Sequence, residues 1–138
     1  MKHQVTPYLT FDGNAREAMA FYAKVFESEM EGIQTFGDAE YPTPPEMDDR
    51  IMHGRLKKDD LLIMFSDSFV SQSVTVGNHI SLALELESEE EINRIYDALR
   101  QEGKVFMELQ DTFWGAIYAK MQDRFGVMWD LNYTKSSS

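Results

Sequence analysis

Asn14-Ala-Arg-Glu17 and Ser88-Glu-Glu-Glu91 are the stretches that decide the fold, because each places a polar residue three positions before an acid where a helical pattern begins. The polar side chain can accept a hydrogen bond from a free backbone N–H of the first turn, while the acid reaches back to the cap. An apolar stripe at helical spacing follows each cap: Ala18, Phe21, Tyr22 and Val25 in the first, Ile92, Ile95, Tyr96 and Leu99 in the second. Asn14 and Ser88 are 74 positions apart, so we expect one half of the chain to copy the other.

Each half is predicted to have the element order βαβββ, with strands where apolar and polar residues alternate. The first half predicts a helix over 14–26 and strands over 4–11, 29–36, 50–56 and 60–66. The second predicts a helix over 88–101 and strands over 79–86, 105–109, 114–121 and 127–133. We therefore expect one α+β domain, 1–138, made of modules 1–67 and 78–134 joined by a linker over 68–77 that is rich in serine and threonine.

Composition limits the classes of partner and site. The chain has 138 residues, of which 43% are hydrophobic, enough for one compact core. Its net charge of −11 argues against nucleic acid and anionic membranes as partners. There is no cysteine, which excludes disulfides and thiolate chemistry. No signal peptide or apolar run long enough to span a bilayer is visible, so we expect a cytoplasmic protein.

Three separated segments carry a family resemblance. They are Pro7-Tyr-Leu-Thr-Phe-Asp-Gly-Asn14 continuing into Glu17-Ala-Met-Ala-Phe-Tyr22, then Gly77-Asn-His-Ile-Ser-Leu82, and finally Asp123-Arg-Phe-Gly-Val-Met-Trp-Asp-Leu-Asn-Tyr133. In this order they resemble the vicinal oxygen chelate superfamily of glyoxalases, bleomycin-resistance proteins and extradiol dioxygenases, and within it the PhnB-like branch. The resemblance implies paired βαβββ modules whose curled mixed sheets form a cup, the glyoxalase/bleomycin-resistance-like fold, usually completed by dimerisation.

The same resemblance implies positions for a divalent metal. In the second module they fall on His79 and Asp130, both competent ligands. In the first module they fall on Thr6 or Pro7 and on Met64, which are poor ligands for a hard cation. We therefore expect no resident cofactor, with a divalent ion at His79 and Asp130 left open as the alternative. A structural role for His79, satisfied by Asp130 or by a backbone carbonyl, also stays open.

Alternation within the strands places the polar candidates on one face. His79 shares a face with Ser81 and Ala83, and Asp130 shares a face with Asn132. Ile80, Leu82 and Leu84 are expected to pack on the helix instead. If the two strands are neighbours, as the family fold implies, His79 and Asp130 come within reach of each other.

Soft and aromatic side chains are expected to line the cup. The ligand-binding candidates are Tyr8, Met64, His79, Trp114, Tyr118, Met128 and Asp130. Thioethers adapt to irregular ligands and ring faces stack on them, so the set suits an apolar or aromatic molecule. Core packing is the alternative for each methionine and aromatic residue taken singly.

Two functions follow from these observations. One is a binding protein or resistance-type module that holds a small apolar or aromatic molecule in the cup of a homodimer. The alternative is a metal-dependent lyase, isomerase or dioxygenase acting on a substrate with adjacent oxygens. Members of this branch have been labelled as methyltransferases, but the eight glycines are scattered singly and form no cofactor loop. Whether the chain is an enzyme, and which residues would be catalytic, therefore stays open.

Overall fold

The computed structural model describes residues 2, 5–40 and 42–135, and the chain divides into two compact units. Unit 1 spans Met1–Thr75 and unit 2 spans Val76–Ser138. The boundary lies in the irregular segment between the last strand of unit 1 and the first strand of unit 2.

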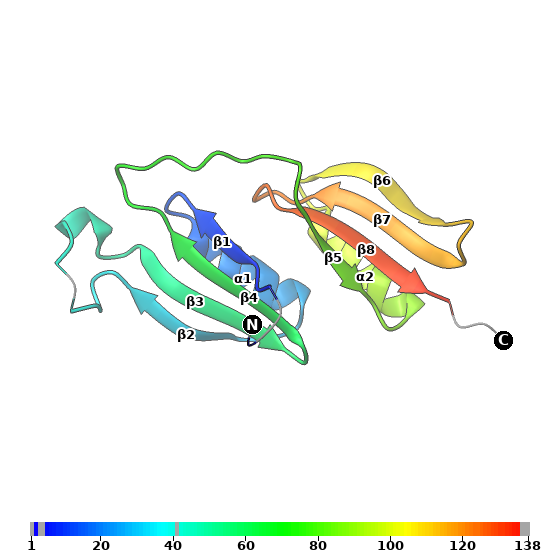
Figure 1. The fold of residues 1–138 in the computed structure, drawn as a ribbon, viewed down its shortest axis with the longest axis horizontal. Coiled ribbons are helices and arrows are strands. Elements are labelled where there is room, and N and C mark those ends of the chain that lie inside the picture. Colours follow the sequence, from blue (N-terminus) through cyan, green and yellow to red (C-terminus); the bar gives the residue numbers. More distant parts are fainter. Residues whose placement is uncertain (1, 3–4, 41, 136–138) are drawn as a thin grey trace. The chain divides into compact units, whose positions relative to one another are not determined.

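Unit 1 is a four-stranded mixed sheet with one helix on one face (Figure 1). The strands lie in the order β1-β4-β3-β2, with β1 parallel to β4 and the other pairs antiparallel. Its elements are β1 (Tyr8–Phe11), α1 (Ala15–Val25), β2 (Met30–Thr35), the 3-10 helix η1 (Pro45–Met47), β3 (Ile51–Lys58) and β4 (Leu61–Asp67).

The core of unit 1 is the aromatic and aliphatic stripe of α1 pressed on β3 and β4. Tyr22 is fully buried, and its ring stacks on Phe65 with centroids 5.8 Å apart. Phe65 in turn lies 6.4 Å from the ring of Phe11. Gly54 lets α1 approach the sheet, because a Cβ there would lie only 2.7 Å from the Met19 sulfur. Of the predicted stripe, Ala18, Tyr22 and Val25 are confirmed as core residues, whereas Phe21 is only half-buried and the core includes Met19.

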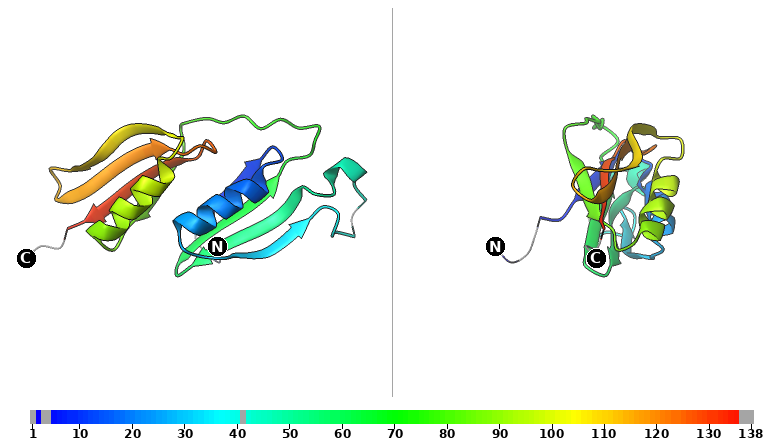
Figure 2. Two further views of the ribbon diagram at one scale, coloured as in Figure 1. Left: turned by 180° about the vertical axis from the view of Figure 1, so that it is seen from behind. Right: turned by 90° about the vertical axis from the view of Figure 1, so that its right-hand side faces the viewer.

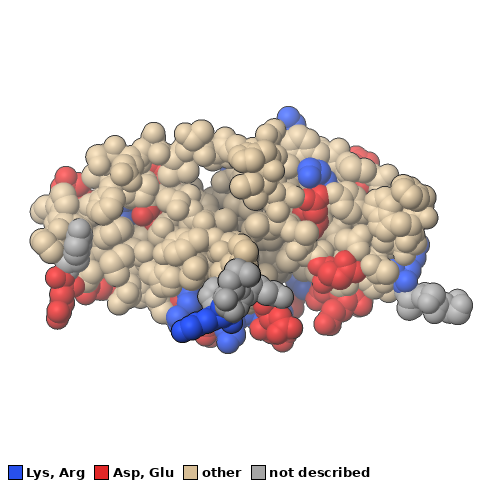
Figure 3. Space-filling view, in the orientation of Figure 1, with Lys and Arg blue, Asp and Glu red and all other residues tan. Residues whose placement is uncertain are grey.

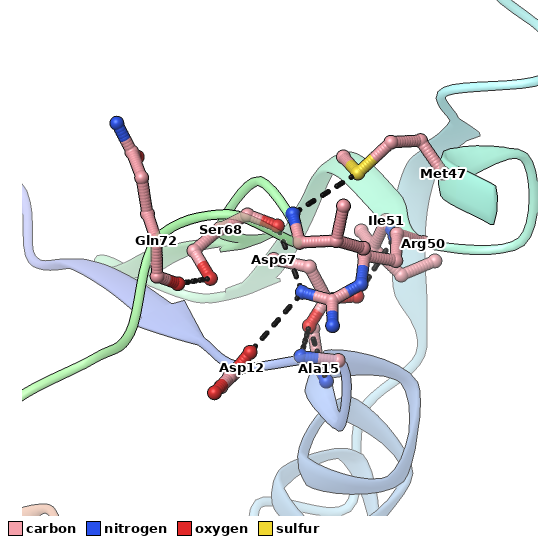
Figure 4. A network of polar contacts seen from close by, with 10 residues as sticks. Asp12, Ala15, Met47, Arg50, Ile51, Asp67, Ser68 and Gln72 are labelled. Atoms are coloured by element: carbon pink, nitrogen blue, oxygen red, sulfur yellow. Dashed lines mark hydrogen bonds and ion pairs between the residues drawn. The ribbon is translucent and has the colours of Figure 1, made fainter. Parts of the chain in front are cut away.

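The start of α1 differs from the prediction. The Asn14 side chain makes no capping hydrogen bond. Instead Asp67, at the end of β4, accepts from the backbone N–H groups of Gly13 and Ala15 at 2.9 Å, and from Ile51 at 2.8 Å (Figure 4). The cap that the local sequence assigned to the Asn14 side chain is thus supplied by the buried carboxylate of Asp67, from a strand distant in sequence.

Unit 2 repeats the plan. Its strands lie in the order β5-β8-β7-β6, with β5 parallel to β8 and the other pairs antiparallel. Its elements are β5 (Ser81–Glu85), α2 (Glu89–Leu99), β6 (Lys104–Asp111), β7 (Ala116–Gln122) and β8 (Met128–Thr134). The rear view in Figure 2 shows α2 in front of this sheet. The predicted α+β fold of βαβββ modules is confirmed.

Local signals in unit 2 agree with its structure. Ser88 accepts a hydrogen bond from the Glu91 N–H at 3.0 Å, and the Glu91 carboxylate accepts from Glu87 N–H at the same distance. The core centres on Trp129, which is fully buried and donates its indole N–H to the buried Asp123 at 2.8 Å. Here the polar cap acts as predicted.

Three strand starts were predicted two or more residues too early, among them β7, which begins at Ala116 and not at Trp114. β1 begins at Tyr8, because Pro7 has no N–H and joins the ladder only through its carbonyl, which accepts from Met64. Gln4 lies outside the described residues. β5 begins at Ser81, the first residue paired with β8, so Ile80 is 68% exposed and does not pack on the helix.

No helix among residues 2, 5–40 and 42–135 is both long and apolar enough to span a membrane.

Candidate functional site

The sheet face opposite α2 gathers most of the predicted site residues of unit 2. We call it the open face of unit 2, defined by Ser81, Ala83, Tyr118, Lys120, Asp130 and Asn132. The cross-strand register pairs Ala83 with Asp130 and Asp130 with Lys120. On the face of the molecule shown in Figure 3, uncharged side chains make up most of the visible surface, although the chain is acidic.

Asp130 is the centre of the polar contacts on this face. Its carboxylate accepts hydrogen bonds from the Ser81 hydroxyl, on one oxygen, and from the Tyr118 hydroxyl, on the other. The Lys120 ammonium lies 3.3 Å from Oδ1 and 3.4 Å from Oδ2. Strands β5, β7 and β8 thus each contribute to one cluster.

The protonation of this cluster follows from its contacts. Burial raises the pKa of Asp130, but hydrogen bonds from Ser81 and Tyr118 and the charge of Lys120 together outweigh it, so the pKa lies below its ordinary value of 3.8. Burial, and then the hydrogen bond to the Asp130 carboxylate, raise the pKa of Tyr118 to about 12. At neutral pH the face therefore carries an ionised carboxylate and a protonated phenol.

Two exposed aromatic residues, Phe113 and Trp114, lie in the loop before β7, with Trp114 beside Tyr118 of the cluster. The Trp114 ring lies 6.0 Å from the Tyr118 ring, edge to face, and 5.0 Å from Phe113. Trp114 is 51% exposed and Phe113 is 98% exposed. The loop is tied at its base, since Thr112 N–H donates to the Ala116 carbonyl at 2.9 Å. Exposed rings thus lie beside a polar anchor.

A second polar group occupies the end of the same face. The Glu85 carboxylate accepts from the Asn132 amide and from the Thr134 hydroxyl, both at 2.7 Å. The Thr134 hydroxyl is the largest cause of a lowered pKa at Glu85, opposed by burial and assisted by Asn132. These contacts tie the edge strand β5 to β8.

The corresponding face of unit 1 has different chemistry. We call it the open face of unit 1, defined by Tyr8, His53, Arg55 and Met64. Met64 pairs with Tyr8 on one side and Arg55 on the other. The Tyr8 hydroxyl lies 2.9 Å from His53 Nδ1. Tyr8 and Met64, predicted as ligand-binding residues, are thus neighbours within unit 1.

His79 and Met128, the remaining predicted site residues, lie outside the Asp130 cluster. His79 is exposed in the bend before β5, and no hydrogen bond joins it to any residue the structure describes. β5 and β8 are neighbours as expected, but Ser81 is the β5 residue that reaches Asp130. Met128 is only 3% exposed. The roles assigned to these residues stay predictions.

Sequence reasoning missed Ser81 and Lys120 as members of the cluster. Alternation placed Ser81 on the polar face, but the strand offset that sets it beside Asp130 is a property of the sheet. Lys120 is recognisable only from the β7–β8 register, which pairs it with Asp130. A period-two pattern gives the face of a residue and not its cross-strand neighbour.

The surroundings of the Asp130 carboxylate do not suit a divalent ion. The two carboxylate oxygens offer about four lone-pair positions, and Ser81, Tyr118 and Lys120 occupy them. An ion bound there would also lie against the Lys120 ammonium. Within the part of the chain that the structure describes, no group of three or more histidine, aspartate or glutamate residues is placed to hold a metal.

Comparison with known proteins gives the family. A family model described as 3-demethylubiquinone-9 3-methyltransferase matches residues 3–132. The protein YjdN of Escherichia coli (strain K12) is 32% identical over 141 residues, which cover 95% of either chain.

Solved structures agree with this assignment. Protein PA1353 from Pseudomonas aeruginosa is 35% identical, with a TM-score of 0.88 over 98% of this chain and 100% of that one. A PhnB protein from Bacillus cereus, described as a putative 3-demethylubiquinone-9 3-methyltransferase, is 28% identical, with a TM-score of 0.79 over 96% of this chain and 100% of that one. The fosfomycin resistance protein FosX from Listeria monocytogenes shares the fold alone, at 10% identity and a TM-score of 0.69 over 98% of this chain and 95% of that one. The chain therefore belongs to the family described as 3-demethylubiquinone-9 3-methyltransferase, and its likeness to a PhnB protein confirms the predicted PhnB-like branch.

Proposed function

We propose that this protein binds a small, largely aromatic molecule on the open face of unit 2, within a cup that a second copy of the chain completes. The observation that carries the proposal is the juxtaposition of exposed rings and a fixed polar cluster on one sheet face. Trp114 and Tyr118 offer ring surfaces, and Tyr118 is itself anchored to Asp130. Ligand sites commonly combine such apolar walls with a few oriented polar groups.

The rigidity of the anchor supports binding. Asp130 holds side chains from two other strands, and no buried side-chain nitrogen or oxygen among the described residues lacks a hydrogen-bond partner. A ligand would therefore meet a preorganised surface, which lowers the entropic cost of association. The exposed Trp114 ring supplies contact area that is not already used in the core.

Dimerisation is part of the proposal because each sheet has one face that its own helix does not cover. Within the described residues, the outer strands β1 and β2 of unit 1 and β5 and β6 of unit 2 each pair on one side only, and such edges favour pairing with another copy. Sedimentation or light scattering at micromolar concentration tests this part. A particle of twice 16.0 kDa is expected, and a stable particle of 16.0 kDa would overturn the dimeric cup.

The methyltransferase description of the family does not extend to a mechanism here. A mixed four-stranded sheet in each unit and singly scattered glycines offer no glycine-rich turn for a nucleotide-type cofactor. The donor set around Asp130 likewise argues for recognition without a divalent ion. Binding is therefore the function that the arrangement supports best.

Thermal unfolding in the presence of aromatic metabolites and antibiotics tests the binding proposal. A ligand present at 100 times its dissociation constant adds about 2.7 kcal/mol to the free energy of unfolding. Trp114→Ala should abolish the shift in melting temperature, while Ile33→Ala, which truncates a comparably exposed side chain in unit 1, should preserve it. A flat response across the panel, or equal shifts in both variants, would contradict the proposal.

A further inference from the structure

Lys120 is the only cation among the six residues that define the open face of unit 2, and its ammonium is only loosely held. Its distances to the two oxygens of Asp130, 3.3 and 3.4 Å, exceed those of a tight ammonium–carboxylate hydrogen bond, about 2.7 to 2.9 Å. The side chain remains 33% exposed. Because an ammonium has three N–H donors and both contacts here are long, Lys120 keeps donor capacity for another partner.

Asp130, by contrast, has little acceptor capacity left. Ser81 and Tyr118 donate to its two oxygens and Lys120 fills the remaining positions. The two hydroxyl donors spread the charge of the carboxylate, so they leave the charge of Lys120 less than fully neutralised. The polar group that this face offers to a ligand is therefore the ammonium and not the carboxylate.

The surroundings of Lys120 define the rest of the ligand. On β6 its cross-strand neighbour is Met107, which is 42% exposed. Two positions away on the same strand and face is Tyr118, whose ring contacts Trp114. A cation flanked by a thioether and two rings suits a flat apolar body that carries an acceptor with negative charge.

We infer that Lys120 is the cation that recognises the ligand, and that the ligand is an aromatic molecule bearing a carboxylate. This inference rests on the proposed function and specifies its ligand class. Asp130 then acts as a positioning residue that holds Lys120 and Tyr118 in place. The ammonium takes the role that a divalent ion would otherwise fill on this face.

Matched pairs of aromatic acids and their neutral amides test the inference: benzoate with benzamide, 4-hydroxybenzoate with 4-hydroxybenzamide, and 2-naphthoate with 2-naphthamide. Dissociation constants are measured by calorimetry on the chelator-treated full chain. Because a charge-assisted hydrogen bond is stronger than a neutral one, at least one acid should bind about tenfold more tightly than its amide. Lys120→Gln should remove this preference, and Lys120→Arg should retain most of it.

Lys104 pairs with Gln122 at the start of β6, its ammonium lies 5.0 Å from the Phe106 ring, and it is not among the residues that donate to Asp130. Lys104→Gln is therefore the matched control. It should leave the acid preference unchanged. Lys120→Met provides a second charge-free variant should Lys120→Gln fail to fold, and melting temperatures establish folding in each case. Asp130→Asn should weaken acid binding while leaving amide binding nearly unchanged.

The outcomes separate this inference from the proposed function. Binding of acid and amide with equal affinity would overturn the inference and leave the proposed function standing. Acid preference that survives in both charge-free variants, or that appears only when Mn²⁺ or Zn²⁺ is added back, would also overturn it. Failure of every acid and amide to bind would overturn both.

Discussion

Met64 in unit 1 and Asp130 in unit 2 lie at corresponding positions of their sheets, but one side chain is an apolar thioether and the other a charged carboxylate. In unit 1 Met64 lies between Tyr8 and Arg55, and in unit 2 Asp130 lies between Ala83 and Lys120. The strand order is the same in both units, so the two residues have equivalent neighbouring strands. The side chain at that position determines which groups gather around it. Met64 leaves Arg55 without a carboxylate beside it on that strand, whereas Asp130 gathers three donors. Of the two open faces, as far as the structure describes them, that of unit 2 alone has three side chains gathered around one carboxylate.

The helix starts differ in the same instructive way. α2 is capped by its own neighbour Ser88, while α1 is capped by Asp67 from the end of β4. A local cap costs little to lose, because water replaces it. A buried cap shared by three backbone N–H groups links the helix, β3 and β4, so its loss should affect the whole unit.

Asp67→Ala should therefore destabilise the protein far more than Ser88→Ala. Removing Asp67 leaves three N–H groups without their acceptor, two of them in buried contacts, at a cost of about 3 to 5 kcal/mol. Ser88→Ala should cost about 1 kcal/mol. Urea unfolding of both variants measures the difference. Equal losses would show that the Asp67 network (Figure 4) is not the stronger cap.

Two glycines give the next contrast. A Cβ on Gly103 would lie 2.3 Å from the backbone oxygen of Gln122, which cannot move without disturbing the β7–β8 turn. A Cβ on Gly54 would lie 2.7 Å from the sulfur of Met19, at the flexible end of a side chain. Gly103→Ala should therefore cost about 1 to 3 kcal/mol, and Gly54→Ala about 1 kcal/mol less. Thermal unfolding checks this order, and a costlier Gly54→Ala would reverse it.

Tyr118, on the open face of unit 2, gives a spectroscopic test. Tyr118 should ionise at about pH 12, because burial and the Asp130 carboxylate disfavour its phenolate. A raised pKa stabilises the fold fully below the ordinary value of 10, and this contribution is lost as pH rises toward 12. The ultraviolet difference between wild type and Tyr118→Phe isolates this titration. Asp130→Asn should move it to lower pH, and an unchanged midpoint would show that Asp130 does not control it.

Acid stability gives the smallest expected effect. The pKa of Asp130 is lowered in the fold, so its contribution is present above the ordinary value of 3.8 and is lost as pH falls below it. Asp130→Asn should flatten the stability profile in that window relative to wild type. Glu85 shifts in the same direction and remains in both proteins, so the difference between them reports Asp130. Parallel profiles would contradict this assignment.

Local patterns in the sequence predicted the elements well. The stripes behind Asn14 and Ser88 form helices, and the alternating segments form strands in the predicted order. Periodicity is a local property, and a buried stripe such as that of α1 is strongly specified by it. The strand starts at Tyr8 and Ser81 were missed by a few residues because partner strands, and not local alternation, decide where a ladder begins.

The site was only partly predictable. Asp130, Tyr118 and Trp114 were identified and do come together. Lys120 was missed because only the register of β7 against β8 brings it to Asp130. The capping role of Asp67 was missed for the same reason, since its three donors are distant in sequence. Contacts between segments distant in sequence depend on the register of the strands, and a single sequence does not show which residues of two strands are paired.

The two tryptophans test the central claim that the open face of unit 2 binds the ligand. Trp129 is fully buried with its indole N–H bound to Asp123, whereas Trp114 is half exposed beside Tyr118. In a ¹H–¹⁵N correlation spectrum, with the indole signals assigned by Trp114→Phe, we titrate in whichever ligand of the thermal panel gives the largest shift. The account predicts that the Trp114 indole signal moves progressively to saturation while that of Trp129 stays nearly fixed. An unmoved Trp114 signal at saturation, with the largest changes in β3 and β4 of unit 1, would contradict it.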